Sequence, residues 1–455
     1  MKENQSIRMD DAPLNKFHIK MAGLTFGAHF NDGYILGIIG TALTLLTPQM
    51  HLNAFWLGLI GSSALIGLFL GSLVLGWVSD IIGRQKIFVL SFVLITIASL
   101  LQFFVDNPSQ LFILRLLIGI GIGGDYSVGH TMLAEFAPKK HRGVLLGSFS
   151  VIWTIGYVVS TFVGLWMQDL GPDAWRWMLA SSTIPSVIIL FLRIGTPESP
   201  RWLINKGRID EAREIAKKYV GKNIVLDNET PLKEDSNFSV LFSKKYRKRT
   251  AFNSLFFACL VMPYFAIYTF LPNILSIMGL KEGFGTDFLL NVILIIGAVL
   301  GIWFTIIFSR RGFLISSFII LVVSLFVLSM SPSSATTLMI ISFAIFTLIL
   351  SAVSNLVGVF PAESFPTEVR SSGVGLATAI SRLGSAISTF LLPLSLSHYG
   401  LSNTMLALTG VLVVGTIVSI AWAPETKYLS LNDASKTDDF KKTTSHPADI
   451  KPNIL

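Results

Sequence analysis

The chain has 455 residues, of which 52% are hydrophobic and only 14% are charged, whereas ordinary soluble domains are about 25% charged. Its mean hydropathy is +0.66. A soluble fold is excluded because its exterior must stay in contact with water, and disorder is excluded because 34 Phe and 9 Trp are present. The single Cys excludes a disulfide framework and a multi-cysteine metal site. The net charge of +8 leaves nucleic-acid binding open until the basic residues are placed.

Many apolar runs in the chain are long enough to cross the hydrocarbon core of a bilayer, which takes about 20 helical residues. The twelve predicted spans are residues 20–47, 55–78, 86–105, 109–136, 142–168, 175–194, 250–278, 285–309, 313–331, 335–362, 370–397 and 403–423. The first run is too long for the core of a signal peptide, so we treat it as a true span. The sequence therefore predicts an all-α polytopic membrane protein with twelve transmembrane helices.

The basic residues gather on one side of the predicted spans. All but four of the 35 Lys and Arg residues fall in the N-terminal segment, in the loops after spans 2, 4, 6, 8 and 10, and in the C-terminal tail. The positive-inside rule makes that side cytoplasmic, so we expect a multi-pass protein of a cell membrane, such as the inner membrane of a bacterium, with both termini in the cytoplasm. Basic charge of this kind sets orientation and contacts lipid headgroups, which excludes nucleic-acid binding.

Two short motifs occur twice, at nearly equal offsets. Ala134–Arg142 and Ala362–Arg370 share Ala, Glu, Pro and Arg at matching places, and Pro197–Ser199 is matched by Pro424–Thr426. A duplication of six helices explains both repeats, since secondary transporters are commonly built from two such halves. The predicted organisation is a cytoplasmic N-terminal segment, a first half, a cytoplasmic linker, a second half and a cytoplasmic tail, at residues 1–19, 20–194, 195–249, 250–423 and 424–455.

Four segments carry a resemblance to a known family. Gly76–Lys86 resembles the signature loop of the major facilitator superfamily, and Glu135–Gly143 and Pro197–Leu203 resemble its sugar-porter branch. Arg115–Tyr126 is similar to the fourth helix of sugar, phosphate and organic-ion members. The similarity covers nearly the whole chain and is greatest to bacterial inner-membrane metabolite transporters. It implies the major facilitator fold, with two pseudo-symmetric six-helix halves.

The chain departs from the sugar porters in two places. The second copy of the signature loop keeps Arg310 and Arg311, but Gly301–Phe308 contains no acidic residue. Span 7 reads Met262–Tyr268, without the paired glutamines that are typical of sugar porters. Those glutamines bind sugar hydroxyls, so the resemblance does not extend to hexose recognition.

Ionisable side chains inside predicted spans are costly and are therefore functional candidates. They are His29, Asp32, Arg115, Asp125, His130 and Arg382. Asp32 lies near mid-membrane, and we expect Arg115 on span 4 to reach it. The resemblance implies that this pair couples transport to protons, and the alternative is a static ion pair that only orients helices. For Asp125, the resemblance to phosphate transporters implies a role with protons or substrate, and the alternative is capping of freed backbone in a glycine-rich helix.

Charged residues at the cytoplasmic ends of the spans form a group of gating candidates. They are Asp80, Arg84, Glu135, Arg142, Arg310, Arg311, Glu363 and Arg370. The resemblance implies inter-helix salt bridges that close the inner side in the outward-open state. A network that forms in one state and breaks in the other biases the equilibrium between them. The alternative is a static role in folding and topology.

Polar and aromatic side chains in the spans are candidates for lining a central cavity, because each needs a partner when it is buried. They are Trp153, Tyr157, Tyr264, Tyr268, Asn273 and Asn355. Arg382 stays charged and offers a planar fork suited to a carboxylate. Organic-anion carriers resemble the chain here, with an arginine at the matching place, which implies a monocarboxylate or a sugar acid as substrate. The alternative is that Arg382 pairs internally with Asp32 or Asp125 and that the substrate is a neutral sugar.

These observations predict a secondary active transporter that moves a sugar, a sugar acid or another organic acid together with protons, by alternating access. Uniport and exchange remain open. A nutrient receptor on a transporter fold would need a long signalling domain, and the tail 424–455 is short. An enzyme would need a cluster of His, Asp or Glu at one membrane face or a phosphate-binding loop, and the sequence has neither. We expect no cofactor and no metal. The expected partners are a small-molecule substrate, protons and the lipid bilayer, and the protein is expected to be a monomer.

Overall fold

The computed structural model describes residues 7–138, 140–141, 145–146, 148–221, 223–226, 238–278, 284–331, 335–365 and 370–426, most of which are helical. The helices of the first half are α1 (Lys16–Gln49), α2 (Ala54–Ile82), α3 (Arg84–Leu101), α4 (Pro108–Phe136), α6 (Phe149–Met167), α7 (Ala174–Ser181) and α8 (Thr183–Arg193). Those of the second half are α11 (Arg247–Thr269), α12 (Leu271–Ile277), α13 (Phe284–Ile307), α14 (Arg310–Met330), α15 (Thr336–Val353), α16 (Leu356–Ser364) and α17 (Arg370–Trp422). Outside the two halves lie strands β1 (Ile7–Arg8) and β2 (Ile224–Val225) and linker helices α9 (Pro200–Asn205) and α10 (Ile209–Ile215), and short 3₁₀ or π turns occur along the chain.

The described helices account for the predicted spans. Within the described ranges, eleven helical stretches are long and apolar enough to cross a membrane. The last of them, Ser372–Trp422, has 51 residues and contains a break at Gly400, whose φ of 75° is readily adopted only by glycine. This stretch therefore holds two spans, as predicted for 370–397 and 403–423. The prediction of an all-α polytopic membrane protein with twelve transmembrane helices is confirmed.

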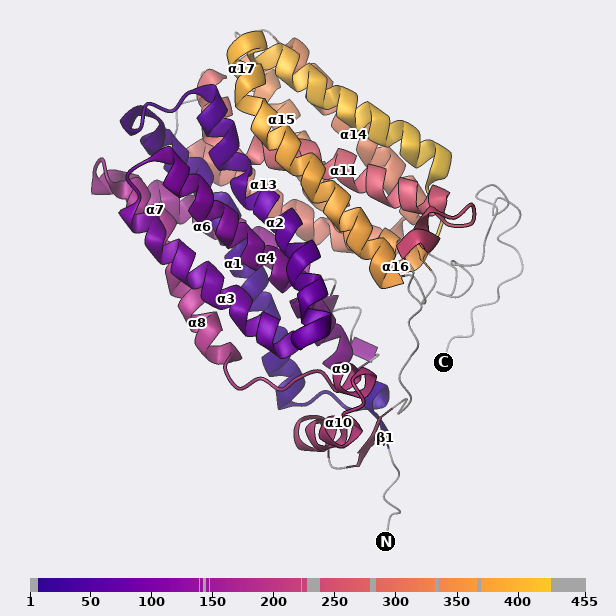
Figure 1. Cartoon of the computed structure of the whole chain (residues 1–455). Helices are drawn as coiled ribbons and strands as arrows, with labels where there is room; N and C mark the ends of the chain where they lie inside the picture. Colours follow the sequence, from indigo (N-terminus) through magenta and orange to yellow (C-terminus); the bar gives the residue numbers. More distant parts are fainter. Residues whose placement is uncertain are drawn as a thin grey trace.

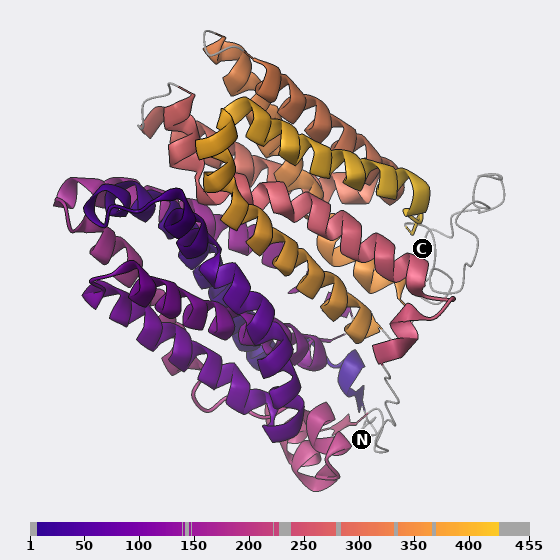
Figure 2. The same ribbon diagram turned by 45° about the horizontal axis from the view of Figure 1, so that its top comes forward.

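The two halves lie side by side, with α1 to α8 in one group of helices and α11 to α17 in the other (Figures 1 and 2). Equivalent helices pack in equivalent pairs: α1 packs on α6 and α2 on α4 in the first half, and α11 packs on α17 and α13 on α15 in the second. Across the boundary, α17 contacts α2, α13 contacts α6, and α1 contacts α11. The duplication inferred from two short motifs is therefore also present in the packing.

Glycines bring the two halves into backbone contact at one end of the molecule. We call this the far end, and the end at which α9 and α10 lie is the linker end (Figure 1). A Cβ on Gly58 of α2 would overlap the carbonyl oxygen of Phe390 in α17, and one on Gly40 of α1 would lie 3.0 Å from the carbonyl oxygen of Thr269 in α11. Small residues permit such close approach of membrane helices. The halves are therefore in close contact at the far end.

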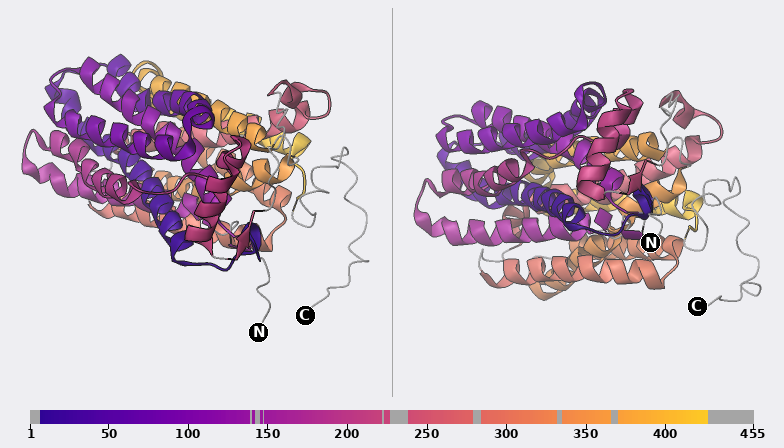
Figure 3. Two further views of the ribbon diagram at one scale, coloured as in Figure 1. Left: turned by 60° about the horizontal axis from the view of Figure 1, so that its bottom comes forward. Right: turned by 90° about the horizontal axis from the view of Figure 1, so that it is seen from below.

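The predicted linker is attached partly to one half and partly to the other. On the first half, the indole Nε1 of Trp202 in α9 donates to the carbonyl oxygen of Asp80 over 3.1 Å. β2 pairs in parallel with β1, which brings the start of the chain to the same place (Figure 3). The 3₁₀ helix Phe238–Phe242 belongs to the second half, where Leu241 packs with Phe365. Each end of the linker is thus attached to the half that it contacts.

Candidate functional site

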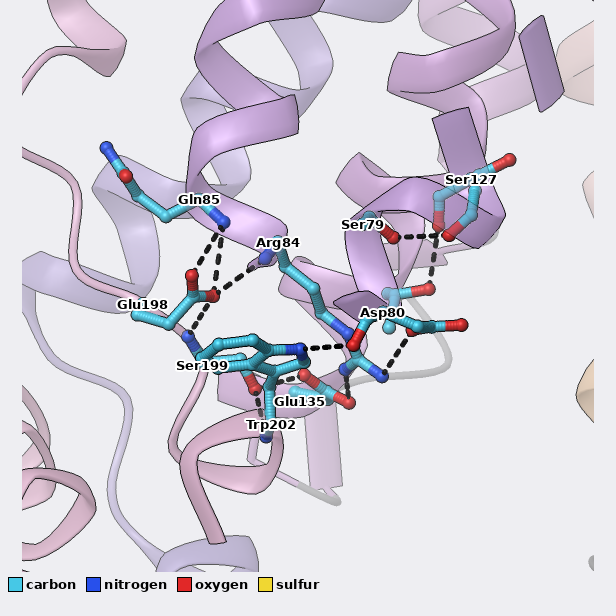
Figure 4. Close-up of polar contacts among 11 residues, drawn as sticks. Ser79, Asp80, Arg84, Gln85, Ser127, Glu135, Glu198, Ser199 and Trp202 are labelled. Atoms are coloured by element: carbon cyan, nitrogen blue, oxygen red, sulfur yellow. Dashed lines mark hydrogen bonds and ion pairs between the residues drawn. The ribbon is translucent and has the colours of Figure 1, made fainter. Parts of the chain in front are cut away.

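Polar and charged side chains join the start of α3, the end of α4 and the linker at the linker end (Figure 4). Glu198 accepts hydrogen bonds from the backbone N–H groups of Arg84 and Gln85 at the start of α3, each over 3.1 Å. The first N–H groups of a helix have no intrahelical partner, and a negative charge is favourable there. Arg84 also pairs with Glu135 at the end of α4, and the hydroxyl of Ser199 donates to the same carboxylate. We call Arg84, Glu135, Glu198 and Ser199 the first-half cluster.

The second half repeats this arrangement. Glu425 accepts hydrogen bonds from the backbone N–H groups of Arg310 and Arg311 at the start of α14, each over 3.2 Å. Arg310 pairs with Glu363 at the end of α16. We call Arg310, Glu363 and Glu425 the second-half cluster. Neither Glu425 nor its counterpart Glu198 was among the predicted gating residues, although the repeated Pro–Glu motif was a signal that could have found them.

Each cluster lies within its own half and joins the ends of different helices. Among the described residues, each ion pair of the clusters joins elements of the same half. Asp80 approaches Arg84 at 3.8 Å, but its side chain is 69% exposed, so this pair adds little. Arg142 and the side chain of Arg370 lie outside the described residues. A gating role for these residues stays a prediction.

A buried ion pair joins α4 and α8. Asp125 pairs with Arg193, and both side chains are 0% exposed. The Arg193 guanidinium also donates to the carbonyl oxygen of Phe88 over 2.8 Å and lies 3.5 Å from the centroid of the Phe88 ring and 4.1 Å from that of Phe92. Removing one partner of such a pair leaves an uncompensated buried charge. Sequence reasoning missed Arg193 because it ends the sixth span, where a long basic side chain is expected to extend toward the headgroups.

Asp32 on α1 is a buried carboxylate without a hydrogen-bond partner. The residue is 0% exposed, and neither of its carboxylate oxygens has a partner among the described residues. It lies within electrostatic range of Asp125, Arg193 and Arg382. Two carboxylates and two arginines therefore share one region, and their formal charges balance when all four are ionised.

The predicted pair of Asp32 and Arg115 is not formed in this structure. Arg115 is 1% exposed, and none of its guanidinium nitrogens has a partner in the described part of the chain. Its position along α4 gives the reason. Asp125 is the residue of α4 near Asp32, and Arg115 precedes it by ten residues, which is about 15 Å along a helix. A role of Arg115 in proton coupling stays a prediction.

Arg382 brings a positive charge from the second half to this region. It is 8% exposed, and its guanidinium lies 5.6 Å from the ring centroid of Tyr126 in α4 and 5.2 Å from that of Phe265 in α11. Asp32 and Tyr264 are within electrostatic range of it. Arg382 is therefore a cation held mainly by aromatic rings, and its neighbour Tyr126 is a residue that the sequence analysis did not assign to the site.

The four predicted aromatic residues meet at the boundary of the two halves. Trp153 and Tyr157 of α6 stack with centroids 5.8 Å apart, and Tyr264 and Tyr268 of α11 stack at 4.9 Å. The Tyr157 hydroxyl donates to the carbonyl oxygen of Tyr268 over 2.9 Å, and the Tyr268 hydroxyl donates to the side-chain hydroxyl oxygen of Thr347 over 2.8 Å. They form one aromatic cluster, in which two hydroxyls are used to join helices.

The two predicted asparagines are not part of this cluster. The side-chain amide of Asn355 donates to the carbonyl oxygen of Ala298 over 3.0 Å, which joins the region between α15 and α16 to α13. Asn273 in α12 is exposed. The structure thus gives Asn355 a packing position and Asn273 a surface position, and it lends their assignment as substrate residues no support. No group of three His, Cys, Asp or Glu residues suited to a metal ion occurs in the described ranges.

Comparison with known proteins gives the family. The chain matches the family described as sugar (and other) transporter over residues 21–437. It is 55% identical over 425 residues to the inner membrane metabolite transport protein YgcS of Escherichia coli (strain K12), covering 93% of this chain and 95% of that protein. It is 28% identical over 429 residues to the arabinose-proton symporter of Bacillus subtilis (strain 168), covering 89% of this chain and 91% of that protein.

The fold is similar to that of a solved transporter. The partially occluded inward open conformation of the xylose transporter XylE from E. coli superimposes with a TM-score of 0.76 at 20% identity, covering 91% of this chain and 100% of that chain. At this identity the likeness shows the fold alone. The family and the relatives are transporters and not enzymes, as predicted. The chain therefore belongs to the sugar (and other) transporter family of the major facilitator superfamily and is a multi-pass membrane protein that transports a metabolite.

Proposed function

We propose that the protein is a proton symporter that moves a small polar metabolite across the cytoplasmic membrane by alternating access. Asp32 carries the proposal, because it is a fully buried carboxylate whose oxygens have no partner among the described residues and which lies beside a charge from the other half. A carboxylate in that position is costly when ionised and becomes neutral when it binds a proton. The relative whose printed name is arabinose-proton symporter supports coupling to protons.

The charges around Asp32 link proton binding to ligand binding. When Asp32 is ionised, its charge and that of Asp125 balance the charges of Arg193 and Arg382. Protonation of Asp32 leaves one positive charge in excess. Asp125 is held by Arg193, so the excess falls on Arg382, for which the described residues provide no ion-pair partner. An anionic group on the ligand restores the balance.

Arg382 supports an anionic ligand, such as a monocarboxylate or a sugar acid. A guanidinium can form two parallel hydrogen bonds to a carboxylate, and the neighbouring rings of Tyr126 and Tyr264 offer faces for the apolar part of a ligand. The second candidate is a neutral sugar, with Asp32 remaining the counter-charge of Arg382 throughout the cycle. The printed name of the arabinose-proton symporter favours that candidate.

Rocking of two rigid halves would expose this region to each side in turn. The first-half and second-half clusters tie helix ends together within each half, so each half can move as a unit. Opening of the far end requires α2 to separate from α17 at Gly58. We place the linker end and both termini in the cytoplasm because the basic residues gather there. Since one chain supplies both sides of the region, the proposed working unit is a monomer.

Uptake into proteoliposomes with an imposed pH gradient tests the proposal. The compounds are L-arabinose, D-glucose, D-glucuronate, benzoate and inorganic phosphate. We expect one of them to accumulate above its outside concentration when the gradient is present, and only to equilibrate when the gradient is collapsed. Accumulation that is equal with and without the pH gradient would contradict proton symport. Uptake limited to the two neutral sugars would contradict the anionic ligand.

A further inference from the structure

Two histidines lie beside the buried carboxylates without a part in the cycle described so far. His29 on α1 comes three residues before Asp32, and His130 on α4 comes five residues after Asp125. The two imidazole rings meet edge to face with centroids 4.7 Å apart. Phe149 of α6 stacks on His29 at 4.1 Å and meets the edge of His130 at 4.5 Å. Three helices therefore hold the two imidazoles in contact.

Backbone carbonyls fix the tautomer of both rings. Nδ1 of His29 lies 2.9 Å from the carbonyl oxygen of Thr25, and Nδ1 of His130 lies 2.7 Å from the carbonyl oxygen of Tyr126. A carbonyl oxygen can only accept a hydrogen bond, so Nδ1 carries the proton in each neutral ring and Nε2 keeps a lone pair. Each ring thus presents an acceptor on the side away from its own helix backbone.

Packing and hydrogen bonding do not explain the Nε2 atom of His29 in this structure. It is buried without a partner among the described residues, and a buried acceptor without a donor costs free energy. The residue is only 2% exposed. A proton can reach it through His130, which is partly exposed. Each ring can take a proton on Nε2 while its Nδ1–H keeps the bond to the backbone carbonyl.

Charges from several helices face the pair. His29 is within electrostatic range of Arg193 from α8 and Arg382 from α17. His130 is within range of Asp125 on its own helix and of Arg382. The two arginines oppose a positive charge that stays on His29, while the carboxylate of Asp125 favours one on His130. Arg382 opposes a positive charge on both rings, so Asp125 and Arg193 are what distinguish His130 from His29.

The histidines also lie on the linker-end side of the carboxylates. α1 starts at the linker end and runs away from it, so His29 is nearer that end than Asp32. α4 runs toward the linker end and finishes there, just after Glu135. His130 is therefore nearer that end than Asp125, which comes before it in the helix. Tyr126 completes the surroundings, with its ring 5.1 Å from that of His29 and 5.5 Å from that of His130.

We propose that His29 and His130 form a proton relay between Asp32 and the linker end, an inference that rests on the proposed proton symport. The carboxyl group of Asp32 gives its proton to Nε2 of His29 and becomes a carboxylate again. His29 passes the proton to Nε2 of His130, and water at the linker end takes it. Both rings return to the neutral Nδ1–H form, and no other reactant is consumed.

Chemical rescue in proteoliposomes tests the relay. In His130→Ala, accumulation of the panel compounds L-arabinose, D-glucuronate and benzoate under a pH gradient should fall at least about tenfold, as expected when a proton-transfer group is lost. Counterflow exchange of the same compounds should keep its rate, since it needs no net proton release. Imidazole inside the vesicles should restore accumulation, whereas pyrazole, which has the same shape and is a much weaker base, should not. The control His51→Ala, at an exposed histidine, should behave as the wild type.

Several outcomes would overturn the relay. Undiminished accumulation in His130→Ala contradicts it, and equal rescue by imidazole and pyrazole shows that His130 only fills space. If the wild type accumulates nothing under a pH gradient, the symport itself fails, which is a separate result.

A measurement without transport keeps the inference testable if the alanine variant does not fold. In ¹⁵N-histidine spectra of the full chain in nanodiscs, His29 and His130 should both show the Nδ1–H tautomer. Replacing His130→Gln should move the titration midpoint of His29, because two rings that share a proton titrate together. Independent titration of the two rings contradicts the relay.

Discussion

The two halves of the protein are alike at the linker end and unlike in the middle of the membrane. At the linker end, the first-half and second-half clusters have the same plan, in which a glutamate accepts from the first amides of a helix and an arginine pairs with a second glutamate. In the middle, the first half supplies Asp32 and the Asp125–Arg193 pair, whereas the second half supplies Arg382. The like clusters hold helix ends together within each half, whereas the proposed shared site takes different charges from its two sides.

The largest expected effect comes from breaking the buried pair of Asp125 and Arg193, which has no counterpart among the described residues of the second half. Arg193→Gln leaves Asp125 buried and unpaired, and loss of one partner typically costs about 3–5 kcal/mol. Thermal unfolding in nanodiscs should therefore show a much lower midpoint. The double variant Asp125→Asn, Arg193→Gln should regain part of the loss because no charge remains. Arg176→Gln is the control, since its partner Asp106 is 80% exposed. A wild-type midpoint in Arg193→Gln would contradict this account of the pair.

The next largest effect concerns Arg382, the charged residue that the second half contributes to the middle of the membrane. Arg382→Gln should weaken binding of an anionic panel compound by about 1.5–3 kcal/mol, the value of a hydrogen bond to a charged group. Tyr268→Phe should cost less, about 1 kcal/mol, because it removes only the neutral bond to Thr347. Calorimetric titration with D-glucuronate and benzoate measures both. Unchanged affinity in Arg382→Gln, together with good binding of L-arabinose, would favour the neutral-sugar candidate.

The likeness of the clusters predicts matched effects in the two halves. Glu198→Gln and Glu425→Gln each weaken two amide hydrogen bonds at a helix start. We expect each to raise hydrogen exchange at the first turn of its helix, α3 or α14, by a similar factor, corresponding to about 1–3 kcal/mol. A change in one half without a change in the other would show that the clusters do not share a function.

The smallest effect is expected at the exposed edge of the first-half cluster. Asp80→Asn should change the free energy of unfolding by no more than about 1 kcal/mol, because its ion pair with Arg84 is exposed to solvent and 3.8 Å long. Glu135→Gln and its counterpart Glu363→Gln break the half-buried ion pairs of the two clusters. Each should shift the population of states, which spin-label distances across the linker end would report. Equal distance distributions in all three variants would leave the clusters with a structural role only.

Hydropathy and repetition predicted the fold because both are properties of the local sequence. The spans follow from the lengths of apolar runs, and a Gly at position 400 allows the last two spans to be read as separate helices. The repeated motifs predicted which charged residues gather at helix ends, and Arg84–Glu135 and Arg310–Glu363 are indeed paired. Their place within one half was not predictable, because a sequence does not state which helices are neighbours in a given conformation.

The sequence predicted how deep in the membrane the central charged residues lie, but not which of them pair with one another. The helical rise places Asp32 and Arg115 deep in the membrane, yet the rotation of each helix and its shift along its neighbours decide which side chains meet, and packing sets both. Arg193 was missed for a related reason, since the guanidinium of a residue at a helix end can extend outward or back into the protein. Here it turns back to Asp125, between the rings of Phe88 and Phe92.

Proton movement on addition of a ligand tests the central claim most directly. Proteoliposomes that contain a pH-sensitive dye receive the panel compound that the wild type accumulates, whether L-arabinose, D-glucuronate or benzoate, with no pH gradient imposed. The account predicts that the interior becomes acidic with wild-type protein and with the exposed control Asp169→Asn. It predicts no acidification with Asp32→Asn, although that variant should still catalyse counterflow of the same compound. Undiminished acidification with Asp32→Asn would contradict the proposal that Asp32 carries the proton.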